Sequence, residues 1–227
     1  MDKTKPSWLR LREDCEQPNI DGYAVPEEAL RAFRLAMGEY ILSDIHGFWY
    51  EPESKEGHAD IDRFAYMIGS RASALCQLYN GSLIGSPIES QLLAAMLWMN
   101  IDWAGFPAVD DIGALDRREP TPSNAVTCFI TPQAEIAGFR VDAALWFQCG
   151  TSRGGVAIEC DGHAFHEKTK EQASRDKARD RSILAAGFPV MRFTGSEIFR
   201  DPVACASQVH EVACSVLLRV SKEGGLI

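Results

Sequence analysis

The chain has 227 residues, of which 46% are hydrophobic and 24% charged, a composition typical of a globular protein with a core of its own. Eighteen glycines and 11 prolines are too few for a fibrous or wholly disordered chain. The sequence contains no run of about 18 apolar residues that would predict a membrane span. Its N-terminal stretch lacks the apolar core of a signal peptide. Seven scattered cysteines without a CxxC pair fit a reducing compartment, so we expect a cytoplasmic protein with no membrane partner.

The charge is unevenly distributed. The net charge of -9 argues against a surface coated with lysine for nonspecific binding of nucleic acid. Residues 140–200, however, carry ten Lys and Arg against eight Asp and Glu, so the excess of acid lies elsewhere. If three acids of this segment hold a divalent cation, its local field becomes positive, as a surface that binds a polyanion requires.

Residues 1–82 are predicted to form a helical N-terminal region of unknown role. Amphipathic patterns over 27–36 and 61–79 predict two helices. The segment 51–58 between them has the composition of a polar loop. Because the region is acidic and carries no recognisable chemistry, it is a candidate protein-binding element rather than a DNA clamp.

Residues 83–227 are predicted to form a second, α/β domain. It begins with a helix after Ser86 and Pro87, followed by a loop over 104–123. Strands are predicted over 126–130, 139–147, 156–162 and 189–193, with a turn over 152–155. Helices are predicted over 167–186, ending at Gly187, and over 202–220. This order indicates an α/β sandwich with a mixed sheet, in which the first strands meander and a crossover adds the last.

Acidic residues within the apolar strands are the candidate chemistry. Glu159 and Asp161 are two residues apart and therefore project from the same face of one strand. Their neighbours are apolar, so an uncompensated pair would suffer desolvation and mutual repulsion, both of which a divalent cation removes. Asp142, in another apolar strand, is a third candidate ligand, and such oxygen ligands suit magnesium or manganese.

These segments together resemble the PD-(D/E)xK nuclease superfamily. The pattern consists of Phe-Arg-Val-Asp at 139–142, Glu-Cys-Asp-Gly at 159–162 with a downstream His, Asp-x-x-Arg at 176–179 and Gly-x-x-Val-x-Arg-Phe at 187–193. It is most similar to the branch of very-short-patch-repair endonucleases and their bacterial relatives, and the resemblance covers about residues 86–200. It implies a restriction-endonuclease-like α/β/α sandwich with a mixed sheet of four to five strands. The implied activity is magnesium- or manganese-dependent hydrolysis of phosphodiester bonds, with DNA of a repair, restriction or mobile-element pathway as the expected substrate.

The resemblance also implies a role for each matching residue. Asp142 would be the central metal ligand and Glu159 the second, with the Cys160 carbonyl facing the metal. Glu89 matches an acidic helix position of the superfamily. Asp161 stands where the superfamily has lysine, so its role in acid–base catalysis would pass to His166, which matches the histidine of the repair-type enzymes. The candidate substrate-binding residues are His163, which has no clear counterpart, Lys168, Arg175, Arg179 and Arg192.

Each motif also has a structural interpretation. Asp142 and Arg140 could form a surface pair, and residues 159–162 a strand end followed by a turn. Glu89, three residues after Ser86, fits a capping box as well as a site. The charged residues over 168–181 could form the solvent-exposed face of a helix. Trp98, Trp103 and Trp146 are expected in the core.

Two further function classes remain open. The missing lysine and the acidic charge are compatible with a catalytically inactive nuclease-like module that binds nucleic acid or protein. His163, His166 and Cys160 could instead belong to a zinc site, although the sequence offers no obvious fourth ligand. The oligomeric state is not predicted.

Overall fold

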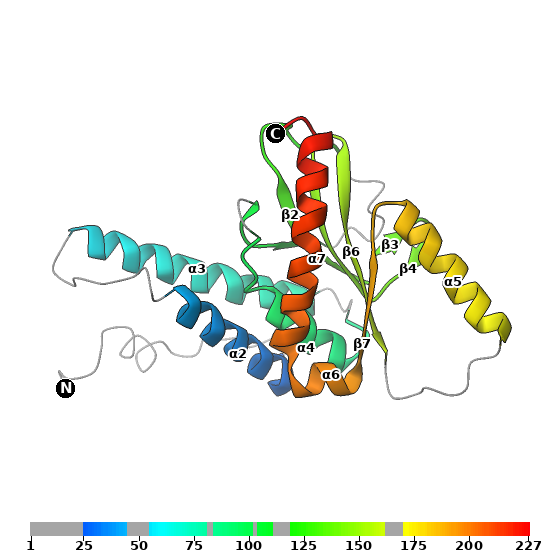
Figure 1. The fold of residues 1–227 in the computed structure, drawn as a ribbon. Coiled ribbons are helices and arrows are strands. Elements are labelled where there is room, and N and C mark those ends of the chain that lie inside the picture. The colour runs from blue at the N-terminus through cyan, green and yellow to red at the C-terminus, as the bar shows by residue number, and fades with distance from the viewer. Residues whose placement is uncertain (1–24, 45–54, 81–83, 102–103, 111–118, 162–169) are drawn as a thin grey trace.

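The protein is described by a computed structural model that covers residues 25–44, 55–80, 84–101, 104–110, 119–161 and 170–227. A mixed five-stranded sheet lies at its centre, with helices on both faces (Figure 1). The expected α/β architecture is therefore confirmed, and it is consistent with a restriction-endonuclease-like fold.

The sheet has the strand order β1-β2-β5-β6-β7. Its strands are β1 (Ala108–Val109), β2 (Thr127–Pro132), β5 (Ala143–Cys149), β6 (Ser152–Asp161) and β7 (Val190–Thr194). The three central strands form the expected antiparallel meander, whereas β1 and β7 pair in parallel with β2 and β6. In the β6–β7 register Glu159 lies opposite Arg192 and Asp161 opposite Thr194.

One face of the sheet is covered by α4 (Pro87–Met96), α6 (Gly195–Arg200) and α7 (Pro202–Glu223), as Figure 1 shows. Helix α4 begins at the N-cap Ser86 with proline in its first turn, and eight of its ten residues are buried. By length and composition α7 is the one described helix that could span a membrane, but its buried residues belong to the core cluster shared with α4 and the sheet.

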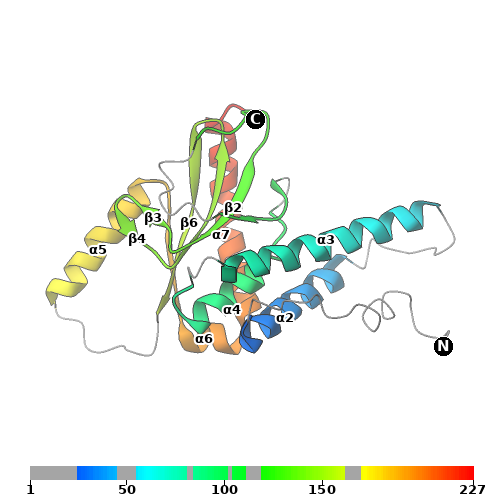
Figure 2. The same ribbon diagram turned by 180° about the vertical axis from the view of Figure 1, so that it is seen from behind.

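The opposite face is covered by α5 (Lys170–Ala185) and by a small hairpin of β3 (Glu135–Ile136) and β4 (Phe139–Arg140), seen from behind in Figure 2. Ile183 of α5 joins Ala157 and Trp146 of the sheet in a second, smaller core. Helix α5 is followed by Gly187 at φ +90°, a left-handed conformation that favours glycine, as the sequence predicted.

The N-terminal helices α2 (Glu27–Asp44) and α3 (Lys55–Asn80) pack into the same core cluster as α4, α7 and the sheet. Phe33 of α2 meets Trp98 edge to face, with ring centroids 5.2 Å apart. Trp98 and Trp146 are buried, as expected, whereas Trp103 lies outside the described residues.

Several predicted boundaries were wrong. Residues 55–58, expected in a polar loop, belong to α3, and the loop 104–123 contains β1. The turn expected over 152–155 lies instead at Gly150 and Thr151. Gly154 and Gly155 belong to β6, where the lack of a side chain leaves room for Arg219 and Trp146. The single strand expected over 139–147 is interrupted at Val141 and Asp142.

Candidate active site

Asp142 lies at the interruption between β4 and β5. Because it is outside the β-ladder, its carboxylate can bond the neighbouring strand, and Oδ2 accepts a hydrogen bond from the Cys160 amide at 2.7 Å. Its carbonyl accepts a second one from the Gln133 amide, also at 2.7 Å. These contacts fix Asp142 beside the end of β6, and the surface pair with Arg140 is not formed, since Arg140 bonds Gln133 instead.

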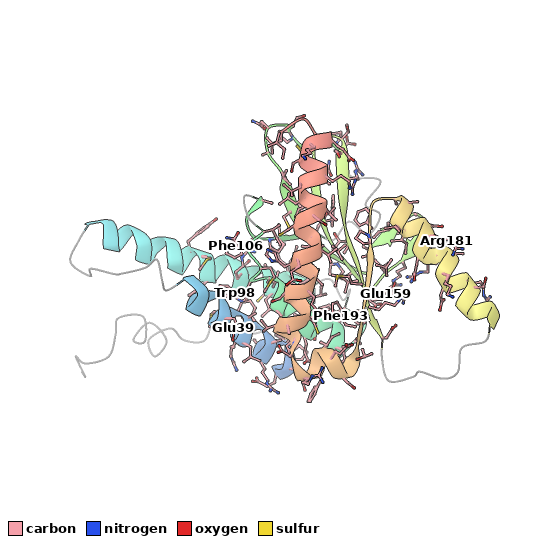
Figure 3. All side chains as sticks on the ribbon, in the orientation of Figure 1. Glu39, Trp98, Phe106, Glu159, Arg181 and Phe193 are labelled. Carbon is pink, nitrogen blue, oxygen red and sulfur yellow. The ribbon has the colours of Figure 1, made fainter. Side chains whose placement is uncertain are left out.

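Glu159 is a largely buried carboxylate paired with an arginine. Its side chain is only 13% exposed, and Oε1 accepts a hydrogen bond from Arg179 of α5. Burial raises the pKa of Glu159, the bond and charge of Arg179 act in the opposite direction, and the nearby Asp142 raises the pKa further. Figure 3 shows Glu159 on the sheet, facing the side on which α5 lies.

Asp161 projects from the same strand two residues later, and its nearest described cation is Arg192 of β7, with Nη1 and Oδ1 3.9 Å apart. Arg192 also donates to Asp180 of α5 at 2.8 Å. Where the superfamily pattern has lysine, this chain thus brings an acid next to an arginine from the neighbouring strand.

Cys160 lies between Glu159 and Asp161 on β6, and the pKa of its thiol depends on the carboxylates nearby. Burial raises the pKa of its thiol most, and four carboxylates raise it further: Asp142, Glu89, Glu159 and Asp161. The thiol therefore stays protonated at neutral pH, and acids from α4, from the turn before β5 and from β6 lie near the end of one strand.

Glu89 takes part in the start of α4, and its predicted role in the site stays a prediction. The Ser86 side chain caps the Glu89 amide, so the helix-start interpretation is correct. The Glu89 carboxylate, in a residue only 6% exposed, accepts from the Gly85 amide at 2.9 Å and from Gln133 Nε2 at 2.7 Å. It does not close the box on Ser86 but reaches toward the Asp142 turn.

The predicted substrate-binding residues separate into two groups. Arg179 and Arg192 contact the acids, while Arg175 is exposed on α5, one turn before Arg179. His163, His166 and Lys168 lie outside the described residues, so the histidine and zinc hypotheses stay predictions.

Asp142 and Glu159 offer the carboxylate oxygens that magnesium or manganese prefers. A cation would offset the cost of burying the Glu159 charge and its repulsion from Asp142. These two residues therefore fit a divalent ion. In the described part of the chain, however, no group of three or more His, Cys, Asp or Glu is arranged to hold a metal. Arginines approach two of the three predicted ligands, Glu159 and Asp161, and the binding of one ion by Asp142, Glu159 and Asp161 together stays a prediction.

Gln133 is a contact of the site that the motifs did not indicate, and it binds Arg140 of the Phe-Arg-Val-Asp motif. Gln133 lies just after β2 and bonds Glu89, Arg140 and the Asp142 carbonyl. A neutral amide has no motif of its own, and the only signal available was its place between two predicted strands.

Part of the chain is similar to a known family of nucleases. Residues 125–212 match the family model REase_MTES_1575, a restriction-endonuclease-like family of the PD-(D/E)xK type. The matched stretch includes Asp142, Glu159 and Asp161 but not Glu89. No curated protein and no solved structure gives a significant match to the chain. The match does not distinguish the very-short-patch-repair branch, so the stretch from β2 to α7 is similar to restriction-endonuclease-like nucleases in general.

Proposed function

We propose that the protein is a metal-dependent endonuclease that hydrolyses phosphodiester bonds in DNA, with Asp142 and Glu159 as its ion ligands. The observation that carries the proposal is the position of these two acids, Asp142 in the turn before β5 and Glu159 on β6, within the stretch that matches the nuclease family model. A bound magnesium ion would supply Lewis-acid activation of the phosphate group.

The residues of the chain contribute orientation and charge. Asp142 is held by the Cys160 amide, so its carboxylate is oriented before any ligand arrives. Arg179 and Arg192 place positive charge beside Glu159 and Asp161, where the superfamily pattern has lysine. We propose that these arginines stabilise the charge that develops on the phosphate, and that His166 transfers the proton.

A catalytically inactive nuclease-like module is the second candidate, and one observation favours it. Arg179 already neutralises Glu159. A guanidinium in this position provides a structural reason for the carboxylate without any ion.

A plasmid-nicking assay with magnesium or manganese, measured across pH, separates the two functions. Asp142→Ala should abolish cleavage, and His166→Ala should slow it by about 10²- to 10⁴-fold, the usual contribution of a general acid or base. Asp161→Lys, which restores the superfamily pattern, should retain activity if this position only adjusts charge.

Glu211→Gln, an exposed acid on α7, is the matched control and should cut like the unmodified protein. If the unmodified protein gains thermal stability with manganese but cuts neither DNA nor RNA, the inactive module becomes the better assignment.

A further inference from the structure

Gln133 adopts a backbone conformation that its residue type disfavours. Its φ is 50°, and Ala137, at 52°, is the only other non-glycine residue with positive φ in the described part of the chain. A non-glycine residue persists in this conformation only where its surroundings impose it. Gln133 stands between β2 and the β3–β4 hairpin.

The side chain of Gln133 lies between the Glu89 carboxylate and the Arg140 guanidinium and bonds both. Its Nε2 donates to Glu89 Oε2 at 2.7 Å, and its Oε1 accepts from Arg140 Nε at 2.8 Å. An amide can do both because it carries a donor and an acceptor at one end. Arg140 and Glu89 thereby lie on opposite sides of the same amide without forming an ion pair.

Arg140 is held in place by Gln133, and no ion pair joins it to Glu135, which lies opposite it on β3. Arg140 is exposed. Its carbonyl oxygen accepts a hydrogen bond from Arg179, and its Nε donates one to Gln133. Within the described ranges, no carboxylate forms an ion pair with the Arg140 guanidinium, and the acid across the hairpin is the exposed Glu135. The two terminal nitrogens of Arg140 are therefore an ordered pair of donors two residues from Asp142, and a phosphate accepts two such bonds side by side.

We propose that Arg140 binds a backbone phosphate of duplex DNA beside the Asp142 and Glu159 carboxylates, and that Gln133 is its positioning residue. This inference rests on the proposed nuclease function and adds a substrate contact to it. The phosphate concerned is a neighbour of the reacting one, because Arg140 contacts neither Glu159 nor Asp142 through its side chain.

Fluorescence anisotropy with a labelled 20-base-pair duplex, with calcium as the divalent ion and over a range of salt concentrations, tests the proposal. Arg140→Gln should weaken binding by about threefold to tenfold and lower the slope of log Kd against log salt by about one, the loss of one phosphate contact. Arg140→Lys should restore the slope, because it restores the charge. In cleavage with magnesium, Arg140→Gln should raise KM and leave kcat unchanged.

Gln133→Asn tests positioning. Asparagine tolerates the left-handed backbone better than glutamine but is one methylene too short to bridge Glu89 and Arg140. This variant should keep the melting temperature and the salt slope while KM rises and kcat stays the same.

Arg34→Gln, which removes an exposed arginine of α2, is the matched control and should bind like the unmodified protein. If Arg140→Gln keeps the Kd and the slope while the unmodified protein binds DNA, the proposal is overturned, and the plasmid-nicking assay decides the nuclease function separately. If the unmodified protein binds no duplex at all, both are overturned.

Discussion

At the scale of single residues, Glu159 is subject to opposing effects: burial disfavours its charge and Arg179 favours it. Its carboxylate is buried beside Asp142, and Arg179 offsets only part of the cost, so the pKa remains above its usual value. A residue chosen for folding alone would not carry this charge. A place where a protein gives up stability in this way is a common property of functional sites.

These opposing effects predict a dependence of stability on pH. Because folding raises the pKa of Glu159, the charged carboxylate is disfavoured in the folded state, and stability from this group is lost as pH rises through the folded pKa. Glu159→Gln should therefore raise the melting temperature in EDTA at pH 7.5. The difference should fade as the pH falls below 4.5, the usual pKa of the group.

Thermal denaturation followed by circular dichroism at both pH values provides the measurement. Glu211→Gln should show no such pattern, since Glu211 is exposed on α7. A lower melting temperature for Glu159→Gln at pH 7.5 would mean that the Arg179 ion pair outweighs the cost of burial.

The sequence was sufficient to identify some of these residues and not others. The two-residue alternation on β6 and the apolar neighbours placed Glu159 and Asp161 on one face, and the family pattern added Asp142. The contact between Glu159 and Arg179 spans 20 positions and depends on how α5 crosses the sheet. The bridge from Gln133 to Glu89 spans 44 and depends on a backbone angle that glutamine disfavours. Neither follows from local pattern.

At the scale of elements, β6 depends on a glycine that allows two strands to approach. A Cβ on Gly155 would lie 2.3 Å from the Leu145 carbonyl oxygen and 2.4 Å from Trp146 Cβ, both on the paired strand β5. Backbone cannot move away cheaply in a central strand. Gly155→Ala should therefore destabilise the protein by about 3 kcal/mol or more, or prevent folding.

Gly69→Ala is the matched control for this substitution. Gly69 is exposed on α3, and a Cβ there meets nothing within 4 Å. Alanine should raise the free energy of unfolding by about 0.5–1 kcal/mol, since glycine is a poor helix former. Urea denaturation of the two variants gives both values, and similar effects in the two would contradict the close approach at Gly155.

The longer elements followed from periodicity, whereas the short ones did not. Helices α4, α5 and α7 lie close to their predicted positions, α2 extends beyond its predicted end to Asp44, and the four longer strands overlap their predicted ranges. Strand β1 and the β3–β4 hairpin have two residues per strand, too few for an alternation to be visible. The interruption at Asp142 escaped prediction because its neighbours on both sides are typical of strands.

At the scale of the whole molecule, one core joins the N-terminal helices to the sheet. Phe33 of α2 is 8% exposed and packs on Trp98, which follows α4. Phe33→Ala should lower the free energy of unfolding by about 3–5 kcal/mol. Leu35→Ala, two residues away and 47% exposed, should change it little.

Differential scanning calorimetry of the two variants tests whether this core is shared. With one core, Phe33→Ala should shift a single transition to lower temperature. Two transitions, of which only one moves, would show that α2 and the sheet unfold independently.

The contrast between α4 and α5 has a consequence for hydrogen exchange. Eight of the ten residues of α4 are buried, whereas in the described side chains of α5 only Ile183 is. Amides of α4 should therefore be among the last to exchange with deuterium and those of α5 among the first, because local opening is easiest where few apolar contacts hold an element. Glu89 would then stand on a part of the molecule that opens only with global unfolding, and Arg179 on one that opens often. Glu159 would exchange its arginine partner for solvent many times before the surface that carries Asp142 and Glu89 is disturbed.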